Sequence, residues 1–276
     1  MCIKIYNIEY RMKNYEYKLL ISEYYTDDIN YINDALSAIP SHPNILIPYK
    51  ASIDADSQLF LHYNNINDSG MTLNNFIHLV NTSKMNIRKT IYNALHRIQP
   101  IVVIQQLIEI YEFMLSSNML IGKSNVNPDN IWIEREHNGH FKISVLYTAE
   151  SIIDNKFRNN SGRKYWSAET MNEYNNITYY NDGSATKPML TRNDTRPSPI
   201  SLVYSLGLIL YFMVEGHDAF EEHRIDVYET PHLSRRVNPF IARLIYSATT
   251  PNYKLRPSLA EWKQQIMYKK SACVII

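Results

Sequence analysis

The sequence predicts an α+β fold in which a small sheet lobe is followed by a larger helical lobe. Strand-like runs come first, at residues 2–10 (CIKIYNIEY), 15–22 (YEYKLLIS) and 59–63 (LFLHY). From Thr72 onward, apolar residues recur at the spacing of a helix rather than of a strand. Strands that precede helices in this way are typical of proteins whose sheet and helices occupy separate lobes.

The first lobe is expected to comprise residues 1–65. The run at 2–10 alternates apolar and polar residues, as a half-buried strand does. Residues 27–39 (DDINYINDALSAI) have apolar side chains at helical spacing, which predicts one short amphipathic helix. A turn at 54–57 then leads into the strand at 59–63.

The second lobe is expected to comprise residues 66–268. LNNFIHLV, which begins at Leu73, and the apolar stretch 101–120 both have helical periodicity. The most apolar segment, ISLVYSLGLILYFMV at 200–214, is shorter than the roughly 20 residues that span a bilayer. We therefore expect this segment to be a helix buried in the core.

The ends of the buried helix are marked in the sequence. Ser198 and Pro199 are the residue types of an N-cap and a first helical residue, and Gly216 suits the position just past the end. The preceding segment 172–198 is rich in Asn, Asp, Ser, Thr and Pro, which predicts a long loop. Such a loop is either a tolerated insertion or a segment that binds a partner.

Composition limits the kinds of partner. The 28 basic and 27 acidic side chains nearly cancel, so no long-range field attracts nucleic acid. The two cysteines, Cys2 and Cys273, lie at opposite ends and have neither metal-ligand spacing nor the pattern of a disulfide framework. The first residues contain no apolar run of signal-peptide length. We therefore expect a cytoplasmic protein that does not bind nucleic acid.

Seven short segments form an ordered set of motifs along the chain. They are SHPNIL at 41–46, LFLHYNNINDSGMTLNNFI at 59–77, NVNPDNIWI at 125–133, FKISVLY at 141–147, YWSAE at 165–169, LVYSLGLILYFMVEG at 202–216 and LRPS at 255–258. In order and spacing they resemble landmarks of the protein kinases, from the turn after the C helix to the arginine-bearing turn before the final helix. NVNPDNIWI resembles the catalytic loop, and FKISVLY resembles the strand that runs into the DFG motif.

This resemblance implies a two-lobed protein-kinase-like fold with a truncated N-terminal sheet lobe. It also implies that Glu169, which matches the glutamate closing the activation segment, pairs with Arg256. A buried charge is tolerated when it is paired and hydrogen-bonded, and the loss of one partner is costly. The two residues are therefore expected to form a structural ion pair.

Phosphoryl transfer by kinases requires a glycine loop over the phosphates, a lysine that holds them, oxygen ligands for Mg²⁺ and a proton-accepting aspartate. No glycine precedes Gly70, so the glycine loop is missing. Lys18 resembles the phosphate-holding lysine, and an ordinary solvated lysine explains it equally well. The glutamate that should pair with this lysine is replaced by Ile32, Asn33 or Asp34, depending on the alignment.

Other positions of the resemblance hold residues that cannot perform the chemistry. Counting back from Asn130, the proton-accepting aspartate is replaced by Asn125 and the neighbouring lysine by Asn127. A carboxamide has no basic site near neutral pH. The Mg²⁺-binding aspartate of the DFG motif is replaced by Val145, whose aliphatic side chain cannot bind a hard cation.

Small shifts of the alignment do not restore the site. Moving by one residue places Ser144 or Leu146 at the metal position, and neither offers a carboxylate. Leu202 replaces the aspartate of the buried helix and is expected to join the core. Asn130 either contacts a nucleotide or cation weakly or serves as a residue that shapes the turn.

The last residues, 269–276, are expected to form a tail. Cys273 is followed by two aliphatic residues and Ile276, which matches a CaaX prenylation box. Lys269 and Lys270 would add attraction to anionic lipid. An apolar end with one chance cysteine is the alternative interpretation.

These losses predict a pseudokinase with no enzymatic activity, no metal and no cofactor, which acts as a protein-binding scaffold or decoy in signalling. The alternative is an atypical protein kinase with weak phosphotransfer activity through another base. Asp129 is the nearest carboxylate, but it matches a turn position that faces away from the chemistry.

A narrower hypothesis concerns the origin and partner of the protein. An alternative alignment places Gly122 and Lys123 at the core of the loop, where the mixed-lineage-kinase-domain-like pseudokinases of necroptosis also have Gly-Lys. The composition, dominated by Asn, Ile, Tyr and Lys, resembles that of proteins from AT-rich genomes such as viral ones. We therefore expect a viral modulator of host cell death or innate immunity that binds a host kinase, in the cytoplasm or at the cytosolic face of membranes.

Overall fold

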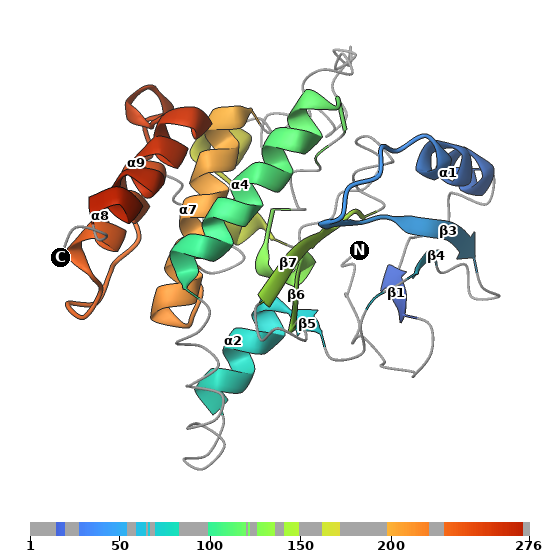
Figure 1. Ribbon diagram of the computed structural model, residues 1–276, viewed down its shortest axis with the longest axis horizontal. Helices are drawn as coiled ribbons and strands as arrows, with labels where there is room; N and C mark the ends of the chain where they lie inside the picture. The colour runs from blue at the N-terminus through green and yellow to red at the C-terminus, as the bar shows by residue number, and fades with distance from the viewer. Residues whose placement is uncertain are drawn as a thin grey trace, which may run out of the picture. The chain divides into compact units, whose positions relative to one another are not determined.

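The computed structural model is a mixed α/β protein with two small sheets and several helices (Figure 1), in agreement with the predicted α+β class. The chain forms two compact units, one from Met1–Phe76 with Ile110–Ser161 and the other from Ile77–Glu109 with Gly162–Ile276. The structure describes residues 15–19, 28–53, 59–64, 66, 70–82, 99–119, 121, 126–135, 141–148, 162–171, 198–220 and 229–272.

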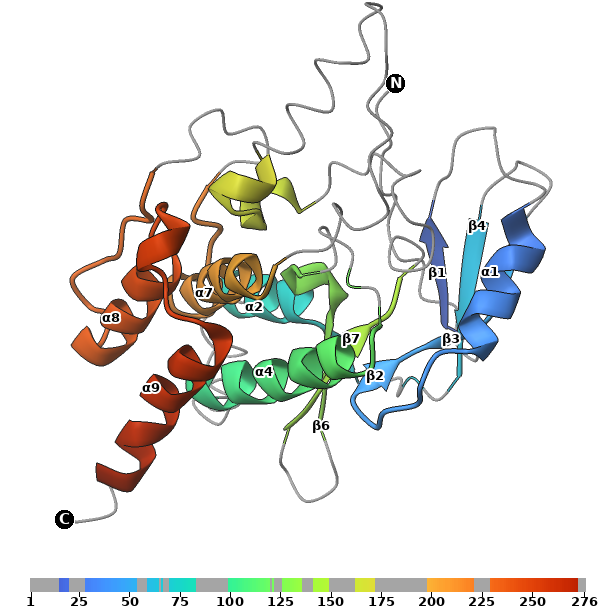
Figure 2. The same cartoon turned by 90° about the horizontal axis from the view of Figure 1, so that it is seen from above.

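The first sheet of the first unit has three antiparallel strands in the order β1-β4-β3, with α1 beside them (Figure 2). These elements are β1 (Tyr15–Leu19), α1 (Asp28–Ser37), β3 (Pro48–Ile53) and β4 (Leu59–Tyr63). The Asn33 side chain of α1 accepts the N–H of Ala51 at 2.7 Å and donates to its carbonyl at 3.2 Å. A helix is thereby joined to the backbone of β3 by one amide.

The second sheet has four strands in the order β2-β7-β6-β5. They are β2 (Ile45–Leu46), β5 (Met71–Thr72), β6 (Ile131–Arg135) and β7 (Phe141–Leu146), and β2 runs parallel to β7. Ile131, Trp132 and Ile133 are consecutive and all buried, so both faces of β6 are covered, since successive side chains on a strand point to opposite faces. Tyr63 Oη of the first sheet donates to the carbonyl of Tyr147, just after β7.

The second unit is built around α7 (Pro199–Glu215), with α8 (Pro239–Ala248) and α9 (Leu259–Ala272) packed against it. The Ser198 side chain accepts the Ser201 N–H, and Gly216 ends α7 with a left-handed φ of 79°. Residues Ser201 to Phe212 of α7 are all buried. The prediction of a buried helix with these two caps is confirmed.

Two further helices include residues of both units. They are α2 (Leu73–Thr82) and α4 (Pro100–Ser116), which match the helices predicted from Leu73 and over 101–120. The second helix is shorter than predicted, because Asn118 takes a left-handed φ of 54° and the Met119 N–H bonds back to the Met114 carbonyl. No described helix is long and apolar enough to cross a membrane.

The compact units differ from the lobes predicted at 1–65 and 66–268. Residues 110–161 belong with the first unit, because β2 pairs with β7 and so joins distant parts of the chain.

β2 and β3 were not predicted, since β2 has two residues and the β3 pairing is irregular between Pro48 and Lys50. The strand predicted at 2–10, the turn at 54–57 and residues 172–197 of the predicted loop lie outside the described residues.

Candidate functional site

The segment that resembles a catalytic loop is held by its own asparagine. Asn127 precedes a short 3-10 helix, η2 (Pro128–Asn130), and its Oδ1 accepts the N–H groups of Asp129 at 2.8 Å and Asn130 at 3.2 Å. The Asn127 side chain is buried, and a lysine there has no acceptor for these N–H groups. The asparagine at the position where the kinase resemblance implies a lysine therefore has a structural role as the cap of this turn.

The turn is also held by a side chain of α2, the helix that follows β5. Asn74 Nδ2 of α2 donates to Oδ1 of Asp129 at 2.7 Å. Asn130 is buried, whereas Asp129 is exposed. Asp129, the carboxylate of this turn, is therefore exposed but accepts a hydrogen bond from the amide of Asn74.

Val145 lies where the resemblance places the magnesium-binding aspartate, and it is a core residue. It is 1% exposed, its N–H donates to the Asn44 carbonyl at 2.9 Å, and it pairs with Ile131 on β6 and Ile45 on β2. Its neighbours in the alternative alignments, Ser144 and Leu146, are buried as well. None of these three side chains offers a carboxylate for Mg²⁺.

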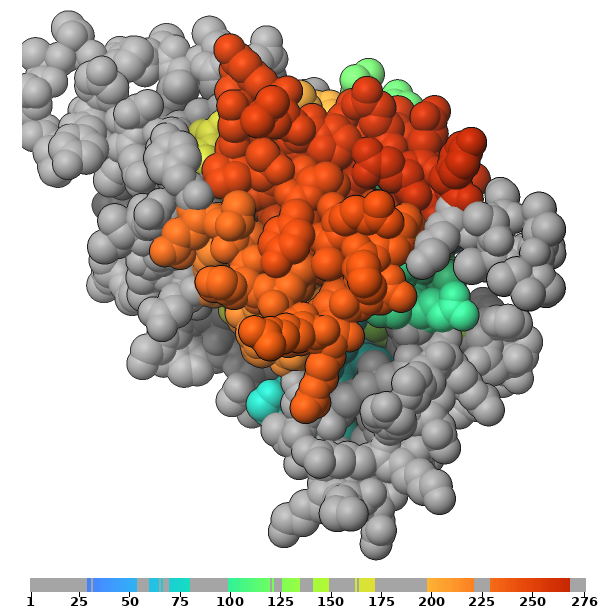
Figure 3. Space-filling model, turned by 90° about the vertical axis from the view of Figure 1, so that its left-hand side faces the viewer, coloured from blue at the N-terminus to red at the C-terminus, as the bar shows by residue number. Residues whose placement is uncertain are grey.

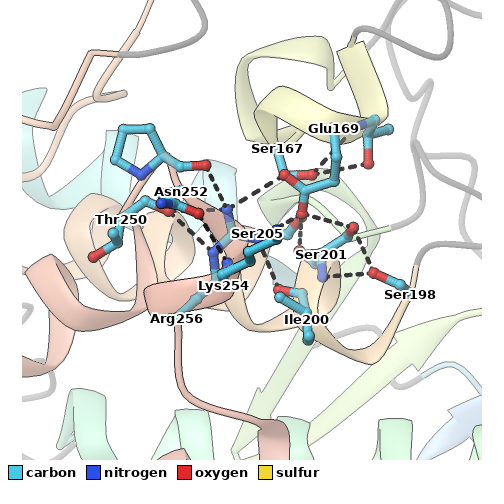
Figure 4. A network of polar contacts seen from close by, with 12 residues as sticks. Ser167, Glu169, Ser198, Ile200, Ser201, Ser205, Thr250, Asn252, Lys254 and Arg256 are labelled. Carbon is cyan, nitrogen blue, oxygen red and sulfur yellow. Dashed lines mark hydrogen bonds and ion pairs between the residues drawn. The ribbon is translucent and has the colours of Figure 1, made fainter.

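Glu169 and Arg256 form an ion pair in the second unit (Figure 4). Nη1 of Arg256 lies 2.6 Å from Oε1 of Glu169, and Nη2 lies 3.4 Å from Oε2. The arginine side chain is fully buried, while the glutamate side chain is 23% exposed. This bidentate arrangement is the geometry in which a guanidinium binds a carboxylate most strongly.

The remaining donors of Arg256 bind backbone carbonyls. Nε donates to Thr250 at 3.2 Å, Nη1 to Ile200 at 3.0 Å and Nη2 to Thr250 at 2.9 Å. The guanidinium carbon also lies 4.8 Å from the ring centroid of Tyr204. One arginine thus joins the start of α7, the turn after α8 and the segment around Glu169.

The charge of Glu169 is set by two opposed effects. Burial alone would raise its pKa, but the hydrogen bond and the positive charge of Arg256 outweigh burial and lower the pKa below its usual value. Ser201 Oγ adds a hydrogen bond to Oε1 at 3.0 Å. Glu169 therefore stays ionised at neutral pH, as a partner for the buried guanidinium.

A second polar contact fixes the segment just before Glu169. The turn η3 (Arg163–Tyr165) is joined to the loop after α7, since Lys164 Nζ and Tyr165 Oη both bind the carboxylate of Asp218. Ser205 of α7 also donates to the Tyr165 carbonyl at 2.8 Å. The segment that resembles the end of an activation segment is therefore anchored to α7 at both ends.

Not every candidate residue can be placed. Asn125, the dipeptide of Gly122 and Lys123, and Cys273 lie outside the described residues. Lys18 pairs with Phe60 between β1 and β4, and only its backbone is described. Ile32, one candidate for the partner of Lys18, is instead a core residue at 1% exposure.

The other two candidates for the lysine partner do not share one role. Asn33 binds the backbone of Ala51, and Asp34 is exposed. In the described part of the chain, no three His, Cys, Asp or Glu side chains gather as metal ligands would. Leu202 is buried at 1% exposure, as predicted.

Sequence reasoning missed the Asn127 cap and the Asp218 anchor. An asparagine directly before proline is a signal for the cap, because Asn favours N-cap positions and Pro favours the first helical position. Nothing in the sequence points to Asp218, whose partners are more than fifty residues away along the chain.

Comparison of the sequence with protein-family models gives no match, and comparison with curated proteins gives no significant match either. The resemblance to protein kinases therefore depends on the motifs of the sequence itself.

Proposed function

We propose that this protein is a pseudokinase that transfers no phosphate and acts by binding another protein. The observation that carries the proposal is the burial of Val145 within the second sheet. An aspartate that binds Mg²⁺ must reach a metal, whereas this side chain is packed between Ile45 and Ile131 on the neighbouring strands. The position serves the core and not a metal.

The turn at Asn127 supports the same proposal. Its amide accepts two backbone N–H groups, so the bend is retained by a residue that has no basic site. The anchoring of Glu169 by Arg256 likewise contributes to a rigid scaffold without contributing chemistry. A fold that keeps its shape and loses its reactive groups is suited to binding.

The partner that we propose is a protein, and a host protein kinase is the specific hypothesis. It depends on the resemblance of Gly122 and Lys123 to the necroptotic pseudokinases and on a composition like that of AT-rich viral genomes. A cytoplasmic site of action, with membrane association through a prenylated Cys273, belongs to the same proposal.

Two assays on the full chain test the loss of activity. The first measures thermal stability with ATP alone, with ATP and Mg²⁺, and with ATP and Mn²⁺. The second measures transfer of labelled phosphate to the protein itself and to a general kinase substrate, with an active kinase as the positive control. We expect no metal-dependent stabilisation and no transfer.

The same assays distinguish the pseudokinase proposal from the alternative of an atypical kinase. Metal-dependent stabilisation together with transfer that is lost in Asp129→Asn would replace the pseudokinase proposal by that alternative. Metal-independent stabilisation by ATP would leave the proposal in place. In that case Lys18 and Asn130 are the residues to test, and the Lys18→Met and Asn130→Ala variants should lose the stabilisation by ATP.

A further inference from the structure

The charge of the chain is unevenly distributed. Residues 229–272 contain eight basic residues and two acidic ones, although the whole chain has 28 and 27. The basic residues are Arg235, Arg236, Arg243, Lys254, Arg256, Lys263, Lys269 and Lys270, and the acidic ones are Glu229 and Glu261. A net charge near zero therefore conceals a strongly basic C-terminal segment in a chain that is otherwise acidic.

Several of these charges are available to a partner. Arg235, Arg236, Arg243 and Lys254 are exposed, and among the described residues their side chains form no ion pair. Arg256 differs from them, because Glu169 neutralises it inside the unit. These four basic charges are thus exposed and are not neutralised by an acidic side chain in the described part of the chain.

Large apolar side chains are exposed in the same part of the chain. Tyr268 is 84% exposed, Leu255 is 73% exposed and Met267 is 53% exposed. Tyr246 and Tyr253 are exposed as well. Exposed apolar groups that cluster at one place mark an interaction site more often than isolated ones do.

An open groove shows that three of these exposed residues, Lys254, Leu255 and Tyr268, are neighbours. It lies between α8, the turn η4 (Tyr253–Leu255) and α9, and its lining includes Lys254, Leu255, Gln264 and Tyr268. Arg243 precedes the lining residue Ser247 by four residues on α8, so the two side chains lie on the same side of the helix and Arg243 borders the groove. Figure 3 looks onto this side of the second unit, with α8 and α9 in orange to red. We call this surface the α8–α9 face.

One acidic residue lines the groove, and it is engaged locally. Oε2 of Glu261 accepts the backbone N–H and the hydroxyl of Ser258, both at 2.8 Å. This is the reciprocal cap of a helix start, which directs the carboxylate toward the first turn of α9. Two basic residues also line the groove, Lys254, which is exposed, and Arg256, which is paired with Glu169.

We propose that the α8–α9 face binds the surface of a bilayer that contains anionic phospholipid. Lys254 and Arg243 would lie near the lipid phosphates, while Leu255, Met267 and Tyr268 would enter the interface. Basic residues beside interfacial Tyr and aliphatic side chains are the combination by which peripheral proteins bind anionic membranes. This inference goes beyond the proposed pseudokinase function and does not depend on lipidation.

The geometry favours a membrane over an acidic peptide. Anchor residues of protein interfaces fill closed and desolvated pockets. Tyr268 and Leu255 instead protrude, since most of their surface is exposed. Protruding apolar groups among positive charges suit a soft interface into which they can insert.

The test uses the full chain with Cys273→Ser, so that no prenyl group contributes. Sedimentation is measured with vesicles of pure phosphatidylcholine and with vesicles that contain about one third phosphatidylserine. We expect binding to the anionic vesicles that weakens as salt is raised, because salt screens the attraction. Arg243→Gln with Lys254→Gln should weaken this binding about fivefold for each charge removed.

A second variant tests insertion, and a third is the matched control. Leu255→Ser with Tyr268→Ser should bind anionic vesicles weakly even at low salt. Tyr49→Ser with Lys50→Gln removes an exposed tyrosine and an exposed lysine from β3 of the other unit and should bind like the parent chain. Thermal unfolding of each variant checks that it is folded.

Three outcomes would overturn the proposal. They are equal binding to neutral and anionic vesicles, unchanged binding by both α8–α9 variants, and binding of a polyglutamate peptide at this face without binding of vesicles. The last outcome would assign the face to an acidic protein partner. Each is independent of the phosphotransfer assays, so failure here leaves the pseudokinase proposal untouched.

Discussion

Arg256 Nη1 lies 2.6 Å from Glu169 Oε1, although 87 residues separate the two in sequence. The contact joins the start of α7 to the turn after α8, because the same guanidinium also binds the carbonyls of Ile200 and Thr250. A buried charge with all of its donors engaged can be removed only at a high cost. The pair therefore provides a test of how the second unit is held together.

Arg256→Met should reduce the free energy of unfolding by about 3 kcal/mol or more, because Glu169 loses its partner. The double variant with Glu169→Met should lose much less than the sum of the two single variants, since no charge is then left unpaired. Urea unfolding followed by tryptophan fluorescence measures these values.

The matched control for this experiment is a more exposed ion pair. Lys142 Nζ lies 3.1 Å from Glu134 Oε1, with side chains 31% and 15% exposed. Lys142→Met should cost about 0.2–1 kcal/mol. If Arg256→Met costs no more than this control, the pair does not stabilise the unit as we infer.

The stability contributed by Glu169 should depend on pH in a defined direction. Its pKa in the folded protein is lowered from the usual 4.5, so folding favours the ionised form. The contribution is therefore fully present above about pH 4.5 and is lost as the pH falls through the lower pKa of the folded state. The difference in unfolding free energy between the parent chain and Glu169→Gln should be constant from pH 7 to about pH 5 and should shrink as the pH is lowered from about 4.5 to about 3. A difference that stays constant over this range would contradict the assignment.

The strongly marked parts of the fold could be predicted from the sequence. The helix from Pro199 to Glu215 has caps at both ends and an apolar surface all round, so both its limits and its burial follow from residue type. β3 has neither capping residues nor a uniformly apolar sequence. It begins at a proline, and its partner β4 comes later in the chain. β2 pairs with β7, with Ile45 opposite Val145, and such long-range pairing leaves no local signal.

In the candidate site, too, some features follow from residue type and others depend on backbone geometry. Residue type alone indicates that Asn127 cannot act as a lysine and that Val145 cannot bind Mg²⁺, since an amide is uncharged and an aliphatic side chain has no oxygen. What these residues do instead could not be predicted from residue type, because the cap of Asn127 and the packing of Val145 between two strands depend on backbone geometry. The basic α8–α9 face was likewise concealed by a net charge of +1.

Asn127 should be required for stability because it accepts two backbone N–H groups. Asn127→Lys restores the residue type of a kinase loop but has no acceptor, so the free energy of unfolding should fall by about 1–2 kcal/mol. Asn127→Asp keeps an acceptor and should be closer to the parent chain. Urea unfolding of both variants compares them, and equal stability of Asn127→Lys and Asn127→Asp would disprove the cap.

Gly207 should tolerate no side chain, because α7 and α8 approach closely there. A Cβ at this position would lie 2.6 Å from Cβ of Ala248 and 3.1 Å from Cγ2 of Thr249. Gly207→Ala should therefore destabilise the protein by about 1–3 kcal/mol, although alanine favours a helix by about 1 kcal/mol. Adding Ala248→Gly removes the nearest atom and should recover part of the loss. A single variant more stable than the parent chain would mean that the helices can move apart freely.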